Sequence, residues 1–463
     1  MARVLIVKSI NMKMWPLEIT LPLGPLYLAS YLRAAGHQVK VLDLRLSRGL
    51  GDSQMESVKE FAPDVLGLSA LTVESAELHR AAERIRREVP SCRKVAVGGP
   101  YGTSSPERAL ADENVDAAVA GEGEAAFLHL VRAWEAGKGA SGIPGVHYRE
   151  GGKILSGGSP DTSADANSYP FPAWDLLHFD DYARAPRMCN LKPGRYAPIF
   201  TSRSCPYHCV FCHNVFGKGF RPRSPENVLE EMELLVTKRN VREFEISDDI
   251  FNLDRERTLA ICEGIASRGW DLRIAFPNGL RADLLDETVL TAMKRAGVYF
   301  MALAVESASP RLQKAIRKNL DLDRASRAME IARKLGITTF GFFMLGFPTE
   351  TEEEMWQTIR FARDSKLNLA AFFTVTAHEG TELWNMVEGT DLDLPVGDGA
   401  WHYGRFRGNL SRLSDKHFAR IKRQAYMHFY GHRPQRVLFC RTLGRVSLLY
   451  VPQAFLRKAV VGR

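Results

Sequence analysis

Three cysteines stand within eight consecutive positions, and they are the residues of this chain best suited to bind a metal. Cys205, Cys209 and Cys212 form the pattern CxxxCxxC directly after the apolar run APIFTS, which is typical of a β-strand. Three thiolates can hold three irons of a [4Fe-4S] cube and leave the fourth iron open to an exogenous chelator. A catalytic cluster needs such an open iron. The pattern therefore predicts that these cysteines are both metal ligands and catalytic groups.

A zinc site is the alternative interpretation of the same loop. Thiolate and imidazole also suit tetrahedral Zn²⁺, with His208 or His213 as the fourth ligand. A zinc site usually draws on a second pair of ligands, and none is visible in the sequence. The other cysteines are scattered, and a total of seven does not suggest paired disulfides. The position of the motif after a strand favours the cluster. The scattered cysteines are Cys92, Cys189, Cys262 and Cys440.

The cysteine loop begins a region in which strand and helix patterns alternate. Six strand–helix units over residues 196–376 predict a partial (β/α)6 barrel. Such folds place their chemistry in the loops after the strands, which is where the cysteines stand. The strand candidates are APIFTS, EFEIS, LRIAF, FMALAV, TTFGFFML and AAFFTV, and the helix candidates are 225–236, 254–268, 284–295, 324–335 and 351–364.

Residues 1–136 show a second alternation of short apolar runs and helical patterns, with helices predicted over 24–35, 75–88 and 124–135. This alternation predicts an α/β, Rossmann-like domain with a parallel sheet. Residues 137–195 are rich in Gly, Pro, Ser and Asp, and they are predicted to be a linker. Residues 377–463 are predicted to be a basic helical C-terminal region. Within it, residues 403–463 hold fourteen Lys and Arg against one acid, Asp415, so most of the net charge of +8 lies there.

Composition and hydropathy indicate an ordinary globular chain. The sequence is 45% hydrophobic and 25% charged, and it has no apolar run of eighteen residues, which predicts a cytoplasmic protein. The basic tail could contact anionic substrate, membrane headgroups or nucleic acid. Its segment VSLLYVPQAFL could touch a membrane surface as an amphipathic helix, although Pro452 argues against one uninterrupted helix.

The cysteine loop resembles that of the radical S-adenosylmethionine (SAM) superfamily, whose signature is CxxxCxΦC with an aromatic at Φ, here Phe211. The resemblance implies that SAM binds the open iron through its amino and carboxylate groups. It also implies reductive cleavage of SAM to a 5′-deoxyadenosyl radical, which abstracts hydrogen from a small-molecule substrate. An external electron donor of the flavodoxin or ferredoxin type would act as partner. Phe211 would lie near the adenine.

The later strand ends resemble further SAM-binding segments of the superfamily. Asp248 stands where the SAM-amino motif lies, although the usual GGE is replaced here by carboxylates that can accept from an ammonium. Arg281 could meet a carboxylate of SAM or substrate. Glu306 is similar to the ESGS-type segment near the ribose, and Gly346 matches the glycine motif beside adenine.

The N-terminal domain resembles the cobalamin-binding domains fused to one large radical SAM class, which includes methyltransferases and the anaerobic magnesium-protoporphyrin ester cyclase. Ser69, Leu71, Gly98 and Gly99 carry the match, since small residues let a nucleotide tail approach the sheet. The cobalt-ligating DxHxxG pattern is replaced by Asp43-Leu-Arg45-Leu-Ser, so no lower axial histidine is expected. Cobalamin and an empty scaffold both stay open. A nicotinamide-binding domain is disfavoured, because no GxGxxG follows the first strand.

The leading hypothesis is a radical SAM enzyme of biosynthesis that methylates its substrate or performs a related radical cyclisation, rearrangement or elimination. A cobalamin-independent dehydratase or decarboxylase is the first alternative, with the N-terminal domain as scaffold. A non-catalytic metal protein that binds nucleic acid through the basic tail is the alternative from another class, and it is disfavoured.

Overall fold

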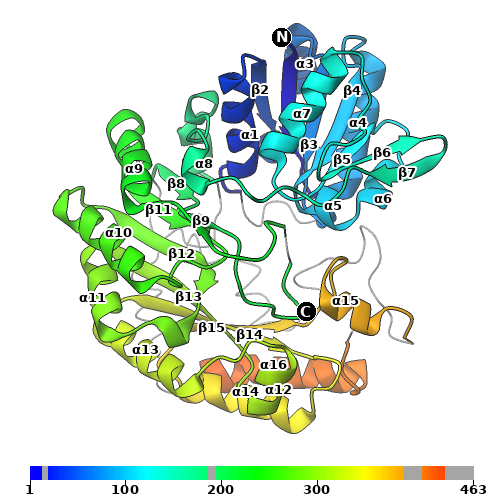
Figure 1. Cartoon of the computed structure of the whole chain (residues 1–463). Helices are drawn as coiled ribbons and strands as arrows, with labels where there is room; N and C mark the ends of the chain where they lie inside the picture. Colours follow the sequence, from blue (N-terminus) through cyan, green and yellow to red (C-terminus); the bar gives the residue numbers. More distant parts are fainter. Residues whose placement is uncertain (13–18, 186–193, 214, 391–408, 433–463) are drawn as a thin grey trace. The chain divides into compact units, whose positions relative to one another are not determined.

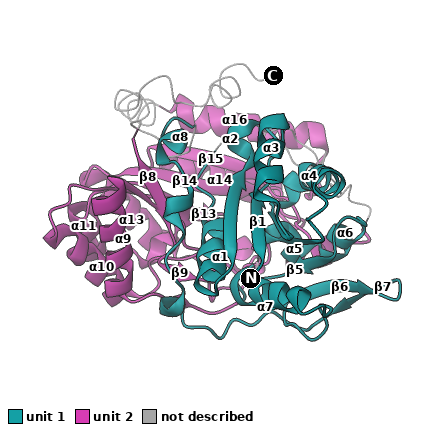
Figure 2. Cartoon of the chain, turned by 90° about the horizontal axis from the view of Figure 1, so that it is seen from above, with its two compact units in different colours: residues 1–185, 213–217, 396–401 teal, residues 186–212, 218–395, 402–463 magenta. Residues whose placement is uncertain are grey.

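The computed structural model describes residues 1–12, 19–185, 194–213, 215–390 and 409–432 (Figure 1). The chain divides into two compact units (Figure 2). Of the described residues, unit 1 comprises 1–12, 19–185, 213 and 215–217, and unit 2 comprises 194–212, 218–390 and 409–432.

Unit 1 is built on a seven-stranded sheet in the order β2-β1-β3-β4-β5-β6-β7. The first five strands in the chain are parallel to one another, as the alternation of strands and helices predicts. On β1, Val4 and Ile6 pack into one apolar core while Leu5 and Val7 pack into another, so the middle of the strand is apolar because both faces are covered. The parallel strands are β1 (Arg3–Lys8), β2 (Gln38–Asp43), β3 (Val65–Ser69), β4 (Lys94–Gly98) and β5 (Ala117–Val119).

Helices cover both faces of this sheet, and the long ones lie where the sequence pattern predicts them. The predicted helices 24–35, 75–88 and 124–135 correspond to α1, α4 and α7. The helices of unit 1 are α1 (Leu23–Ala34), α2 (Leu44–Ser47), α3 (Asp52–Phe61), α4 (Ser75–Glu88), α5 (Gly99–Ser104), α6 (Pro106–Leu110), α7 (Gly123–Glu135) and α8 (Phe179–Ala183).

Residues 137–195 differ from the predicted linker, because they contribute two strands to the sheet of unit 1. Strands β6 (Val146–Glu150) and β7 (Lys153–Ser156) pair antiparallel with each other, and β6 pairs antiparallel with β5. Gly151 and Gly152 have φ of 57° and 77°, as a two-residue hairpin turn requires. The strand pattern is hard to see in the sequence because all four residues of β7 are exposed and do not alternate.

Unit 2 is built on a six-stranded, fully parallel sheet in the order β15-β14-β13-β12-β11-β8. Strands β8 and β15 form its two edges, so the sheet is an open barrel, as the six strand–helix units predict. The strands are β8 (Tyr196–Ile199), β11 (Glu243–Ile246), β12 (Arg273–Leu280), β13 (Val298–Glu306), β14 (Thr338–Leu345) and β15 (Leu369–Thr374).

The crossover helices of unit 2 have clear start signals. The Ser224 side chain accepts a hydrogen bond from the backbone N–H of Asn227, as an N-cap residue does, and Pro225 stands at the first helical position, where proline is favoured. Asp254, Asp286 and Asp321 cap the three helices that begin after them. The helices are α9 (Pro225–Arg239), α10 (Arg255–Ser267), α11 (Glu287–Arg295), α12 (Pro310–Ala315), α13 (Leu322–Lys334) and α14 (Glu352–Asp364).

The C-terminal region contains two described helices, α15 (Glu382–Val387) and α16 (Asp415–Gly431). Helix α16 contacts α14 and β15, where Tyr426 and Tyr430 donate their hydroxyls to the carbonyls of Phe372 and Ala370. Most of the basic tail and the segment VSLLYVPQAFL lie outside the described residues. In the part of the chain that is described, no helix is long and apolar enough to cross a membrane.

Candidate cluster and cofactor site

The cysteine loop is closed at its base by a short antiparallel ladder. After β8, strand β9 (Ser202–Arg203) pairs with β10 (Arg221–Pro222), so the residues between them form a loop at the carboxyl end of β8. Ser204, directly before Cys205, has φ of 69°. A left-handed serine is uncommon and is held only where its surroundings require it. The chain thus turns sharply into the motif.

The crown of the cysteine loop, residues 207–210, is fixed by contacts with neighbouring segments of unit 2. The Arg281 guanidinium lies 4.0 Å from the centroid of the Tyr207 ring, and Lys218 Nζ donates to the Tyr207 carbonyl over 3.0 Å. The backbone N–H of Val210 donates to the Ile316 carbonyl over 3.2 Å. Burial raises the pKa of the Cys205 thiol, and the charge of nearby Asp249 raises it further. Binding of a metal centre must therefore displace the thiol proton.

The cysteines of the loop offer the donor set that a cubane cluster needs. A cubane takes one thiolate on each of three irons. Cys205 and Cys209 are half-buried and Cys212 is exposed, each as a free thiol. The donor set fits the cluster.

Asp248 lies at the end of β11 but directs its carboxylate to the cysteine loop. It is 3% exposed and accepts from the Thr201 backbone N–H over 2.6 Å and from the hydroxyls of Thr201 and Ser202. These bonds occupy both oxygens, so they do not support the prediction that Asp248 receives the SAM ammonium. Asp249 is the carboxylate of this strand end whose charge acts on the Cys205 thiol.

Arg281, at the end of β12, already has a carboxylate partner. Its Nε lies 3.0 Å from Asp283 Oδ1, and it donates to the carbonyls of Lys318 and Asn319 over 2.9 Å each. With its guanidinium also stacked on Tyr207, Arg281 joins β12 to the cysteine loop. The expectation that Arg281 meets a carboxylate of SAM or substrate is not supported by these contacts, because Asp283 holds that place.

Glu306 ends β13 in a strained conformation. Its φ is 67°, which a β-carbon disfavours, and such outliers cluster at functional sites. Burial raises the pKa of its carboxyl, and the Lys318 ammonium, 3.7 Å from Glu306 Oε1, opposes that rise. Sequence reasoning missed Lys318, because it follows a short helix rather than a strand.

Gly346 follows β14 with φ of 97°, and a β-carbon there would lie 2.9 Å from the Phe418 ring, so only glycine fits. The rings of Phe211 and Phe347 have centroids 5.8 Å apart, which places the aromatic of the cysteine motif beside the residue after Gly346. The two predicted adenine contacts therefore come together. Glu350 was missed by the sequence analysis; it accepts from the backbone N–H groups of Gly346 and Phe347 over 2.6 and 3.1 Å.

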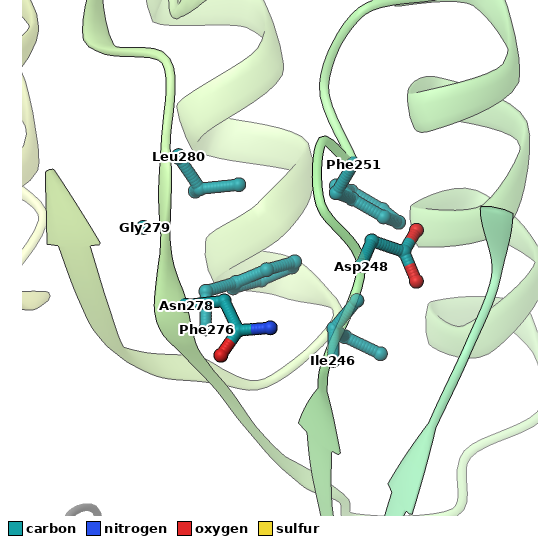
Figure 3. Close-up of a pocket in the computed structure, with 7 residues that line it drawn as sticks. All are labelled: Ile246, Asp248, Phe251, Phe276, Asn278, Gly279 and Leu280. Carbon is teal, nitrogen blue, oxygen red and sulfur yellow. The ribbon is translucent and has the colours of Figure 1, made fainter. Parts of the chain in front are cut away.

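A small hollow lies between the ends of β11 and β12 (Figure 3). It has no room even for a water molecule and is lined mainly by apolar side chains. The hollow by itself therefore does not hold SAM. In Figure 3 the Asp248 carboxylate points away from Asn278 and Leu280. The lining residues are Ile246, Asp248, Phe251, Phe276, Asn278, Gly279 and Leu280.

The four predicted cobalamin contacts meet at the carboxyl edge of the sheet in unit 1. Ser69 and Gly98 are paired in register at the ends of β3 and β4. Gly99 has φ of 75°, and a β-carbon there would lie 3.1 Å from the Ala70 carbonyl oxygen. A β-carbon on Gly98 would meet nothing closer than 3.8 Å, and Leu71 is 46% exposed. This edge offers half-buried small residues and an exposed apolar side chain, which fits a flat organic cofactor.

Arg45 stands where the cobalt-ligating pattern DxHxxG would have histidine. Its Nε and one terminal nitrogen donate to both Asp43 oxygens over 2.9 and 2.7 Å. The Tyr182 hydroxyl also donates to Asp43 over 2.9 Å. This buried pair confirms that no imidazole is available at that position, because a guanidinium stays protonated and cannot ligate cobalt.

An open parallel barrel with a CxxxCxΦC loop after its first strand defines a class of iron–sulfur enzymes that start radical reactions from SAM. The sequence matches the Radical SAM superfamily over residues 199–362 and the B12 binding domain over residues 17–131. An uncharacterized methyltransferase of Pyrococcus horikoshii is 33% identical over 413 residues, which cover 88% of this chain and 87% of that protein.

Cytidylyl-2-hydroxyethylphosphonate methyltransferase of Streptomyces wedmorensis is 29% identical and covers 79% of this chain and 77% of its own. The solved structure of the cobalamin-dependent SAM radical enzyme OxsB, with aqua-cobalamin and SAM bound, has the same fold. Its TM-score is 0.77 at 17% identity, over 96% of this chain and 71% of that chain. The chain belongs to the radical SAM superfamily, in the class that carries an N-terminal B12-binding domain. It is an enzyme whose cofactors are a [4Fe-4S] cluster, SAM and cobalamin.

Proposed function

We propose that this enzyme transfers a methyl group to a small-molecule substrate of a biosynthetic reaction. The observation that carries the proposal is the cysteine loop at the carboxyl edge of six parallel strands, in a chain that also holds a cobalamin-type domain and is 33% identical to a methyltransferase over most of its length. When bound, the cluster supplies the electron that cleaves SAM, and cobalamin supplies a methyl carrier.

Each residue of unit 2 that we assign to this site has one task. Cys205, Cys209 and Cys212 hold three irons and leave one open for SAM. Phe211 and Gly346 flank the adenine, since Phe211 pairs with Phe347 beside the glycine turn. Glu306 lies near the ribose. Asp249, rather than Asp248, accepts from the SAM ammonium, because Asp248 already bonds Thr201 and Ser202.

In unit 1, we assign Ser69, Leu71, Gly98 and Gly99 to cobalamin. The partial exposure of Ser69, Gly98 and Gly99 and the exposed side chain of Leu71 support this assignment. A bound cobalamin would receive no histidine ligand from this position, because Arg45 stands there. The cobalamin-free dehydratase or decarboxylase and the nucleic-acid-binding protein are not favoured, because the most similar relatives reported above are methyltransferases.

The working domains we propose are residues 1–136 for cobalamin, 196–376 for the radical chemistry and 377–463 as the C-terminal region. The strands β6 and β7 attach residues 146–156 to the first of these. We also propose a cytoplasmic protein, since five described cysteines are free. Its electron donor is of the flavodoxin or ferredoxin type.

Anaerobic reconstitution with iron, sulfide and a corrinoid tests the proposal. The protein is expected to retain one corrinoid per chain and, with a reductant, to convert SAM to 5′-deoxyadenosine. With SAM labelled in its methyl group and a small-molecule extract added as the source of substrate, a labelled methylated product is expected alongside it. Cys209→Ala should abolish 5′-deoxyadenosine. Formation of 5′-deoxyadenosine without any corrinoid retention would instead support the cobalamin-free alternative.

A further inference from the structure

Four buried charged side chains surround the stem of the cysteine loop, residues 200–204. Asp248 is 3% exposed, Arg257 6%, Arg223 5% and Glu231 0%. Charges are removed from water only at a large cost in free energy unless they are paired and hydrogen-bonded. Four buried charges next to a metal-binding loop therefore indicate that the backbone of the stem must keep one conformation, because burying them does not by itself stabilise the fold.

The hydrogen bonds of these four residues converge on the stem. Asp248 accepts from the backbone N–H of Thr201 over 2.6 Å and from the Ser202 hydroxyl over 2.7 Å. Arg257 donates to the carbonyl oxygen of Thr201 and, over 2.8 Å, to that of Arg223. The backbone of Thr201 is thus held at both its N–H and its C=O.

The second arginine extends the same arrangement to the preceding residue. Arg223 donates to the Phe200 carbonyl over 2.8 Å and pairs with Glu231. Its Nε donates to the Asn227 side chain over 2.7 Å, at the start of α9. Side-chain hydrogen bonds therefore connect the stem to the end of β11 and to helices α9 and α10.

Regular secondary structure alone does not hold this part of the chain. Strand β8 ends at Ile199, and the ladder between β9 and β10 has two residues on each side. Ser204 has φ of 69° directly before Cys205. A short ladder and a left-handed residue fix the direction of a loop only where neighbouring groups hold them.

We propose that Asp248 and Arg257 are positioning residues for the [4Fe-4S] cluster: they hold Thr201 and Ser202 so that the chain enters the loop in the conformation that presents Cys205 to the cluster. The inference rests on the proposed cluster site, and it assigns Asp248 to the cluster loop instead of to SAM. Neither side chain needs to touch the cluster to act.

Asp248→Asn and Arg257→Gln test the proposal in the full-length protein. Asp248→Asn removes the negative charge that faces Arg257, and it replaces one acceptor oxygen beside the Thr201 and Ser202 hydroxyls by an NH2 group that can only donate. Both variants are expected to hold less than half of the wild-type iron after anaerobic reconstitution and desalting. The electron paramagnetic resonance (EPR) spectrum of the remaining reduced cluster should be altered before SAM is added.

The double variant tests whether the two residues act together. If both residues position the stem, the double variant loses no more iron than the worse single variant. The effects of substituting neighbouring residues that share one task are not additive. Ser202→Ala is the milder variant. It removes one bond without leaving a buried charge unpaired, so it should show the same change in a smaller degree even if the charge variants fold poorly.

Two matched variants separate positioning from other roles. Glu243→Gln changes an equally buried carboxylate of β11 that is bonded to Tyr299 over 2.6 Å, away from the loop. It should lower the melting temperature at most and leave the EPR spectrum unchanged. Asp249→Asn should keep the cluster and lose the change that SAM causes in the spectrum.

Three outcomes overturn the inference. Wild-type iron and EPR in Asp248→Asn, with SAM binding weakened about tenfold, would make Asp248 a SAM ligand. A lower melting temperature with an unchanged spectrum in all variants would make the group merely structural. A wild-type chain that takes up no cluster would overturn the proposed function, and this inference with it.

Discussion

At the scale of single residues, the site combines side chains whose chemistry is set by burial. Glu306 has a strained backbone, and Glu350 has a buried carboxyl. Glu306 is the last residue of β13, and Glu350 lies in the segment after β14, the neighbouring strand of the same sheet. Glu350 fixes the glycine turn through two backbone N–H groups. Burial raises the pKa of its carboxyl to about 8, although those two hydrogen bonds favour the charged form.

The raised pKa of Glu350 predicts a pH-dependent stability. The folded chain holds this proton more tightly than the unfolded chain, whose carboxyl has a pKa near 4.5. The contribution of this proton to the free energy of unfolding is therefore complete below about pH 4.5. It is lost as the pH rises through about 8, and the loss is on the order of 5 kcal/mol. Glu350→Gln should gain stability relative to wild type between pH 5 and 9, measured by denaturant unfolding. Glu353→Gln, on the exposed side of α14, is the control. If the free energy of unfolding changes with pH in the same way in wild type, Glu350→Gln and Glu353→Gln, the prediction is wrong.

Gly346→Ala should weaken both the fold and the SAM site. The φ of 97° costs an alanine roughly 1 kcal/mol or more, and the new methyl group would lie 2.9 Å from the Phe418 ring. A lower melting temperature and weaker SAM binding to the reconstituted protein are expected. Gly336→Ala serves as the control, since Gly336 also has a positive φ of 69° but nothing within 4 Å. Equal losses in both variants would show that only backbone strain matters.

At the scale of elements, the cysteine loop depends on its neighbours at both ends. Arg281 holds the crown through Tyr207, while the charged residues around Asp248 hold the stem. The loop is a connection between two-residue strands, so these contacts replace the order that a longer ladder would give.

Arg281→Lys should loosen the crown of the loop. A lysine keeps the charge but loses the planar stack on Tyr207 and one of the two bonds to the carbonyls of Lys318 and Asn319. We expect several-fold faster loss of iron on exposure to a chelator, and slower formation of 5′-deoxyadenosine. Tyr207→Leu should have the same effect, whereas Tyr207→Phe keeps the ring and should match wild type. A Phe variant as impaired as the Leu variant would rule out the stack.

Gly98→Leu should reduce the retention of a corrinoid without unfolding unit 1. A β-carbon at Gly98 would make only ordinary contact with Val119, at 3.8 Å, so a longer side chain can be placed at the edge that we assign to cobalamin. Gly139→Leu is the control, because a β-carbon at Gly139 would meet nothing within 4 Å and Gly139 follows α7 instead of a strand. Equilibrium binding of hydroxocobalamin measures the effect, and wild-type affinity in Gly98→Leu would remove this edge from the cobalamin site.

At the scale of the whole molecule, the two cofactor sites belong to different units and to different sheets. The cysteine loop follows β8 in the six-stranded sheet, and the small-residue edge follows β3 and β4 in the seven-stranded sheet. Each sheet has its own core, so the loss of one cofactor should not unfold the other site.

Replacing Cys205, Cys209 and Cys212 together by Ala should separate the two functions. The variant is expected to lose bound iron and all formation of 5′-deoxyadenosine, while hydroxocobalamin binds with wild-type affinity and the melting temperature of the apoprotein stays unchanged. Iron analysis and corrinoid titration on the same preparation check this. Loss of both cofactors at once would show that the sites depend on each other.

The sequence alone determined the class of this protein and the order of its parts. Spacing of cysteines and repetition of apolar strands are local patterns, so the metal motif, the six-strand order and most helix limits could be predicted. Residues 137–195 could not, because the exposed strand β7 lacks alternation. The tertiary structure decided what the strand-end residues do. Asp248 and Arg281 follow strands at the positions where cofactor ligands are expected, yet they contact Thr201 and Tyr207, since the direction of a side chain depends on partners that are distant in the chain.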